Sequence, residues 1–330
     1  MLKQKEADLK KQKGYGYSKE RMSLLFQTYR MLLIALGMAI ILTIVSPSFL
    51  TVNNLRNVAL QISINGILAA GMTMIIITGG IDLSVGSILA IAGVVAGRIL
   101  VVNSQNIVLP ILIALVIGML LGLLNSLFIT YGNMPPFIVT LAIMGITRGF
   151  ALIFTAGYPI WDLPDSYIMI GNGRLFNVIP VPFIIMIVVM IITSLFLKYS
   201  VLGRNLYAIG SNVEAAKLSG INVKKSLMTA YTISGLLAAV AGIILSARMR
   251  IAEPMAGSGY ELDAITATVI GGTAMTGGEG TIWGTFLGVI IMGIIRNGLI
   301  LLDVSSFWQQ VAIGFLLLMA VLIDCLKRKE

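Results

Sequence analysis

Long apolar runs recur along the chain from residue 30 onward, and short stretches rich in polar residues or glycine separate them. A helix needs about 20 predominantly apolar residues to cross a bilayer, and most of these runs come close to that length. The pattern therefore predicts an all-α, polytopic transmembrane helix bundle. About ten spans are expected, at 30–46, 58–78, 84–101, 107–130, 136–156, 180–198, 227–247, 262–275, 282–301 and 307–325.

The composition supports a membrane protein. The chain is 58% hydrophobic and 11% charged, whereas about 25% of the residues of a soluble domain are charged. A net charge of +9 would by itself fit a nucleic-acid-binding protein. The basic residues, however, gather in short segments between apolar runs, as the positive-inside rule of membrane proteins describes. We therefore expect contact with membrane lipid and no nucleic-acid partner.

The distribution of lysine predicts the topology. Every lysine lies in one of three segments, 1–30, 198–225 and 327–329, and an even number of spans places all three on one side. Both termini are therefore predicted to be cytoplasmic. No cleavable signal peptide is expected, because no small-x-small pattern follows the first apolar run. The predicted parts are an N-terminal tail (1–29), a transmembrane domain (30–326) with a long inside loop (199–226), and a C-terminal tail (327–330).

Several kinds of chemistry are excluded by residue content. The chain has one cysteine, Cys325, and no histidine. An intrachain disulfide, a cysteine metal site, histidine metal ligands and histidine-based catalysis are all excluded. We expect no metal site and no catalytic residues.

The first polar motif is the segment Gly79–Gly86 between the second and third expected spans. Its polar and glycine residues are Gly79, Gly80, Asp82, Ser84 and Gly86. In one interpretation this is a tight cytoplasmic turn in which Asp82 and Ser84 compete to cap the next helix. In the other it is a broken helix whose backbone lines the solute path or a gate. The two interpretations are compatible.

A second glycine-rich motif spans residues 271–280, where lipid-facing helix is disfavoured. The candidate residues are Gly271, Gly272, Thr273, Gly277 and Gly278. No lysine follows in the position that a phosphate-binding loop requires. This segment is either a flexible loop between helices or a gate. Thr276-Gly277-Gly278 repeats Thr78-Gly79-Gly80 with similar downstream spacing, which makes an internal repeat a hypothesis.

The long inside loop contains a short run with good helix propensity. Asn212 is a suitable N-cap and Gly220 a suitable stop, so a helix is predicted at about 213–219. One interpretation is an interfacial anchor. The favoured one is a docking helix for a cytoplasmic partner, because the run is too polar to insert strongly. The candidate contact residues are Asn212, Glu214, Ala215, Ala216, Lys217, Ser219, Gly220, Ile221 and Asn222.

Charged residues also lie near or within apolar runs. Glu253, Glu261 and Asp263 are close in sequence to Arg248 and Arg250, so we expect either local pairing or contact with an outside partner through complementary charge. Arg148 and Arg296 stand inside apolar runs, where each should pair with a carboxylate or bind backbone carbonyls.

Several stretches together resemble one family. They are SPSFLTVNNLRNV (46–58), GMTMIIITGGIDLSVGSILA (71–90), GRNLYAIGSNVEAAKLSGINV (203–223), SGLLAAVAGII (234–244), GSGYELDAITATVIGGTAMTGGEGTIWGT (257–285) and NGLILLDVSSFWQQ (297–310). With these, the chain resembles the permease subunits of ribose-type ABC importers, within the family of branched-chain amino acid and sugar permeases. The resemblance covers essentially the whole chain after about residue 25.

The resemblance implies the partners. A second permease chain, expected to be an identical copy, completes the pathway, a cytoplasmic subunit binds ATP, and an extracytoplasmic binding protein delivers a monosaccharide. This chain would hold no cofactor and no ATPase site of its own. The family's coupling segment maps onto residues 203–223, which makes 199–226 the coupling loop. The expected location is the bacterial cytoplasmic (inner) membrane.

The expected mechanism is alternating access, in which ATP-driven movement of the docking helix tilts the bundle and the two glycine-rich segments act as hinges or gates. The alternative is an ion-coupled secondary transporter, which needs titratable or cation-coordinating groups in the membrane. Asp82 is the main candidate for such a group. The motifs leave the exact sugar open among ribose and related monosaccharides.

Overall fold

A computed structural model describes residues 31–102 and 106–327 of the chain. Each of the ten predicted apolar segments coincides with a helix there, and eight of these helices are long and apolar enough to cross a membrane. The two shorter ones are the helix Met31–Val45 and α11 (Tyr260–Ile270). The eight long helices are α2 (Val52–Ile77), α3 (Val85–Val102), α4 (Val108–Thr130), α5 (Pro136–Thr155), α7 (Val181–Tyr199), α10 (Val223–Met249), α12 (Ile282–Leu301) and α13 (Ser306–Lys327).

Three further helices and a small hairpin lie outside the spans. α6 (Asp165–Asn172) and the strands β1 (Arg174–Leu175) and β2 (Ile179–Pro180) fold the loop before α7. The helices α8 (Val201–Ser211) and α9 (Val213–Leu218) fold the loop after it. The predicted all-α polytopic bundle is confirmed. The tail 1–29 and most of 327–330 lie outside the described residues, so their cytoplasmic placement remains a prediction.

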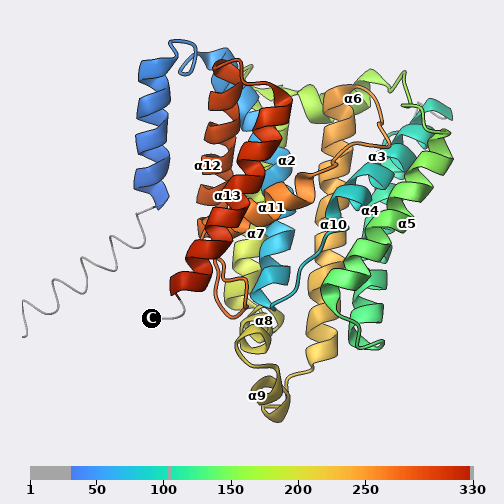
Figure 1. The fold of residues 1–330 in the computed structure, drawn as a ribbon. Helices are drawn as coiled ribbons and strands as arrows, with labels where there is room; N and C mark the ends of the chain where they lie inside the picture. The colour runs from blue at the N-terminus through green and yellow to red at the C-terminus, as the bar shows by residue number, and fades with distance from the viewer. Residues whose placement is uncertain (1–30, 103–105, 328–330) are drawn as a thin grey trace, which may run out of the picture.

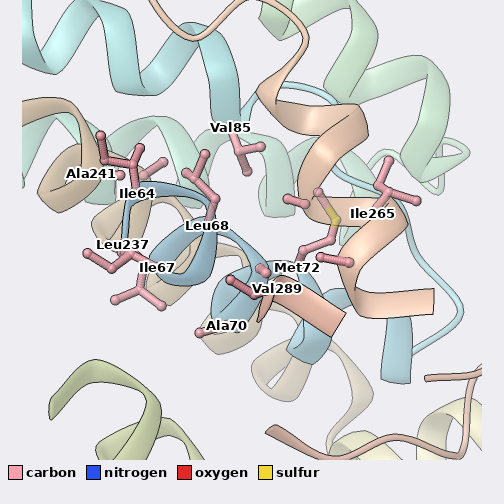
Figure 2. Close-up of a cluster of buried hydrophobic side chains, with 14 of the residues drawn as sticks. Ile64, Ile67, Leu68, Ala70, Met72, Val85, Leu237, Ala241, Ile265 and Val289 are labelled. Atoms are coloured by element: carbon pink, nitrogen blue, oxygen red, sulfur yellow. The ribbon is translucent and has the colours of Figure 1, made fainter. Parts of the chain in front are cut away.

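The helices α2 and α10 form the centre of the bundle. In the apolar part of α2, 83% of the residues are buried inside the bundle, against 6% in α13. Figure 2 shows the core between them, where Ile64 and Ile67 of α2 lie near Ala241 and Leu237 of α10. Van der Waals packing stabilises this core. The hydrophobic effect adds little, because lipid tails are as apolar as the core itself.

Small residues let α10 approach α4 closely. A Cβ added to Gly235 would overlap the backbone of Gly118 and Gly122, and one added to Gly122 would overlap the Tyr231 carbonyl. Backbones in membrane bundles come this close only where glycine or another small residue removes the side chain. The contact explains why α4 and α10 pack along much of their length.

Two non-helical segments interrupt the bundle from opposite ends (Figure 1). The segment 78–84 runs from the end of α2 into the interior, where α3 begins. The segment 250–259 runs from the other end of α10 into the interior, where α11 begins. The two helix starts meet, because a Cβ on Gly86 of α3 would overlap the Gly257 carbonyl and the Glu261 carboxylate.

Candidate functional site

The helices α8 and α9 project beyond one end of the bundle (Figure 1). The predicted helix at 213–219 is present as α9, which begins and ends as expected. The Asn212 side chain accepts a hydrogen bond from the Ala215 N–H at 2.9 Å, and Gly220 adopts φ +78° just after the helix. That left-handed conformation is typical of a glycine that terminates a helix. Asn222 then caps α10 by accepting from the Lys225 N–H at 2.9 Å.

Most of the predicted contact residues are exposed. The exposed ones are Asn212, Glu214, Ala215, Lys217, Ser219, Gly220 and Asn222. Ala216 is buried and Ile221 is half-buried, and the Ile221 N–H donates to the Ala216 carbonyl at 3.0 Å. The backbones of these two residues close the turn, whereas the other residues are exposed.

Leu218 belongs to this surface, although the sequence analysis did not single it out. Its side chain is 90% exposed at the last turn of α9. Burial of such an exposed leucine against a partner would contribute about 1.5–3 kcal/mol. The signal in the sequence was an isolated leucine within a short polar helix.

The two glycine-rich segments come together at this same end. The Gly278 N–H donates to the Ile77 carbonyl at the end of α2 at 2.8 Å, and Gly277 packs against the backbone of Gly79. The other predicted residues lie apart from this contact. Gly271 packs on the backbone of Gly284, and Gly80 packs on the Tyr231 side chain. Gly272 is exposed and Thr273 is buried. Gly86 of α3 packs against the start of α11, as described above.

The break after α2 is a buried turn in which the Asp82 side chain binds Ser84. The Ser84 carbonyl accepts from the N–H groups of Ser87 and Ile88 at 3.0 and 2.9 Å. The Asp82 carboxylate accepts from the Ser84 N–H at 2.9 Å and from its hydroxyl at 2.5 Å. Asn125 donates to the same hydroxyl at 2.8 Å. The predicted turn is present, but among the described residues neither the Asp82 nor the Ser84 side chain accepts a hydrogen bond from a first-turn N–H of α3, so the predicted side-chain cap is wrong. The turn also lies inside the bundle, since Asp82 and Ser84 are both 0% exposed. A role as a gate remains a prediction.

Substitution of Asp82 by asparagine separates a role in the turn from ion coupling. An asparagine side-chain oxygen can accept the same hydrogen bonds, and the neighbours of Asp82 are hydroxyl and amide groups. We expect D82N to retain at least about half of the wild-type solute uptake, as measured in proteoliposomes. D82A leaves the buried Ser84 N–H without its acceptor and should cost about 1–3 kcal/mol of stability in a thermal unfolding assay. Complete loss of uptake in a stably folded D82N protein would contradict a role confined to the turn.

A second charged group lies at the start of α11. Arg296 of α12 forms a 3.0 Å ion pair with Asp263, and Asn65 of α2 donates to the same carboxylate at 3.2 Å. The expected local pairing of Asp263 with Arg248 or Arg250 is therefore wrong. Those two arginines are closer in sequence, but the fold brings α12 against the carboxylate. Asp263 ties α2, α11 and α12 together.

Arg148 of α5 binds backbone carbonyls. Its guanidinium donates to the carbonyls of Pro254 and Ala256 at 2.6 and 2.8 Å. These carbonyls lie in the non-helical segment 250–259, which consists largely of turns. Both arginines were expected to pair with a carboxylate or to bind backbone carbonyls. Arg296 pairs with a carboxylate and Arg148 binds carbonyls, so the expectation is confirmed. In the described part of the chain, no group of three or more His, Cys, Asp or Glu side chains could hold a metal ion.

The fold defines a multi-pass helical membrane protein with a helix pair that projects at one end. Comparison with protein families then identifies it more closely. The family described as "Branched-chain amino acid transport system / permease component" matches residues 54–321. The chain therefore belongs to this family of transport permeases, and the resemblance seen in the sequence is confirmed.

The curated relatives are sugar permeases by name. The chain is 48% identical to the ribose import permease protein RbsC of Bacillus subtilis over 87% of this chain and 89% of that protein. It is 43% identical to RbsC of Escherichia coli K12 over 86% and 89%. The D-allose transport system permease protein AlsC of E. coli K12 is 34% identical over 90% and 91%. No solved structure gave a significant match.

Proposed function

We propose that this chain is the membrane-spanning permease subunit of an ATP-driven, binding-protein-dependent importer of ribose or a closely related monosaccharide. The observation that carries the proposal is the 48% identity to a ribose import permease along nearly the whole of both chains. The projecting helix α9 and the residues that flank it support the proposal, because seven of the predicted contact residues and Leu218 are exposed there.

The proposed orientation places α8 and α9 in the cytoplasm of a bacterial cell, with the chain in the cytoplasmic membrane. Lys198, Arg204, Lys217, Lys224 and Lys225 all lie at this end, as the positive-inside rule favours. With ten helical segments both chain ends then lie on the cytoplasmic side. The α6 and hairpin loop faces the other side, where a sugar-binding protein would dock.

The proposed mechanism is alternating access in a complex of two permease chains, two cytoplasmic ATPase subunits and a binding protein. ATP would bind to the ATPase subunits, and this chain would hold no cofactor. A monosaccharide is uncharged, so its path needs hydroxyl and backbone groups and no ion pair. The ion pair of Asp263 with Arg296 and the Arg148 contacts are accordingly assigned to the stability of the bundle.

Reconstituted transport tests this proposal. The chain is placed in proteoliposomes with its ATPase subunit and binding protein, and uptake of radiolabelled ribose is measured with and without ATP. We expect uptake only in the complete, ATP-supplied system, and competition by unlabelled ribose stronger than by allose or xylose. Uptake by this chain alone under a proton or sodium gradient would contradict the proposal and support the ion-coupled alternative.

A further inference from the structure

The last turn of α8 lies between the end of α2 and the glycine-rich loop 271–281. A Cβ on Gly210 of α8 would overlap both the Ile77 carbonyl and the Gly278 N–H. These two groups are themselves joined by a 2.8 Å hydrogen bond. Gly277 packs on Gly210 from the side of the loop, and its own neighbour there is Gly79. The three backbones meet at distances that only glycine allows.

A side-chain hydrogen bond fastens the same contact. The Tyr207 hydroxyl, one turn before Gly210, donates to the Gly280 carbonyl at 2.8 Å. Partial burial raises the pKa of the Tyr207 phenol above its usual value, so the hydroxyl stays protonated and remains a donor at physiological pH. The glycine-rich loop is therefore held to α8 through a side chain as well as through backbone packing.

α8 is joined directly to α9. Asn212 is at once the C-cap of α8 and the N-cap of α9. Its N–H donates to the Ala208 carbonyl at 3.1 Å and its side chain accepts from the Ala215 N–H at 2.9 Å. No loop separates the two helices. A displacement of α9 must therefore move the Tyr207–Ser211 turn or break the shared cap.

We propose that Gly210 and Tyr207 are positioning residues that transmit movement of α9 to the two glycine-rich segments at once. This inference rests on the proposed function, since it assumes that a partner moves α9. Closely packed backbone groups shift together because the interior has few voids to absorb a displacement. The positive φ angles of Gly79, Gly277 and Gly278 are conformations that glycine leaves with little steric cost. One push on α9 is thereby shared between the break after α2 and the loop before α12.

The test uses the complete complex in proteoliposomes and two variants of different severity. In G210A the added methyl separates α8 from Ile77 and Gly278, and in Y207F only the hydrogen bond to Gly280 is lost. We expect the ATPase subunit to co-purify with both variants as with wild type. ATP-dependent uptake should fall about tenfold in G210A and about two- to fivefold in Y207F, which corresponds to the usual range of coupling between sites. ATP hydrolysed per sugar imported should rise.

Two matched controls distinguish transmission from simple packing. Gly314 of α13 has nothing within 4 Å of an added Cβ, and Tyr199 is an exposed tyrosine at the end of α7. G314A and Y199F should keep wild-type uptake per ATP. The inference is overturned if Y207F and G210A also keep it, or if their uptake falls only in proportion to the amount of folded protein. If G210A fails to fold, Y207F decides alone. A wild-type complex without ATP-dependent uptake would overturn the proposed function and this inference with it.

Discussion

Replacing Arg296 with alanine is expected to destabilise the bundle by about 3–5 kcal/mol, because a buried carboxylate would lose its counter-charge. Asp263 is 3% exposed and the Arg296 side chain 21% exposed, and their charged atoms lie 3.0 Å apart. The remaining partner of Asp263 is the Asn65 amide at 3.2 Å, which is uncharged and cannot replace the arginine. The loss is measured as the thermal unfolding transition of the purified chain in detergent.

The paired substitution provides the control. In D263N/R296Q both charges are removed, and the double variant should recover most of the stability that R296A loses, because no unpaired buried charge remains. A second control is the exposed pair between Lys217 and Glu214 at 2.8 Å, where K217A should change stability by less than about 1 kcal/mol. An R296A protein that unfolds at the wild-type temperature would contradict this account of the ion pair.

The sequence predicted the spans well because a span is a local property of about 20 apolar residues. It predicted their starts less well where a polar helical turn precedes the apolar run. α2 was expected from residue 58 but begins at Val52, with Thr51 accepting from the Asn54 N–H at 3.3 Å. α10 was expected from 227 but begins at Val223, after the cap at Asn222. In both helices the first turn carries polar residues, so the apolar run starts later than the helix.

The contacts between distant segments could not be predicted from local patterns. Both glycine-rich motifs were recognised, but their meeting at Gly210 depends on how α2, α8 and α12 pack. The same holds for Arg296, whose partner Asp263 is distant in sequence, and for Arg148, whose carbonyl partners lie in the non-helical segment before α11. The resemblance of Thr78-Gly79-Gly80 to Thr276-Gly277-Gly278 remains a hypothesis of a repeat. What the structure adds is that these two motifs touch.

The recurring order of a long helix, a non-helical segment and a helix that begins in the interior is a further example. It occurs at α2, 78–84 and α3, and again at α10, 250–259 and α11. Apolar runs alone did not predict it, because the second of these segments has no glycine pair like Gly79-Gly80 and reads as an ordinary outside loop. The Arg148 carbonyl partners and the contact of Gly257 with Gly86 show that this segment enters the bundle.

Replacing Leu218 with aspartate is expected to have the largest effect on the assembly of the complex. Leu218 is 90% exposed on α9, and burying a leucine against a partner contributes about 1.5–3 kcal/mol. Its loss, together with the cost of burying a carboxylate in the same place, should weaken binding of the ATPase subunit about 10- to 100-fold, since each 1.4 kcal/mol corresponds to a factor of ten. ATP-dependent uptake should fall to the same extent at limiting ATPase subunit.

Two comparisons make this prediction specific. L218M keeps an apolar side chain of similar volume and should bind the ATPase subunit within about threefold of wild type. L175D places the same charge on the half-exposed leucine of β1, at the opposite end of the bundle, and should leave that affinity unchanged. The affinity is measured by titrating the ATPase subunit onto the purified chain in nanodiscs. L218D and G210A then differ in kind, because the first should lose the partner and the second should keep the partner but lose the movement. Wild-type affinity in L218D would show that the partner binds elsewhere on the chain.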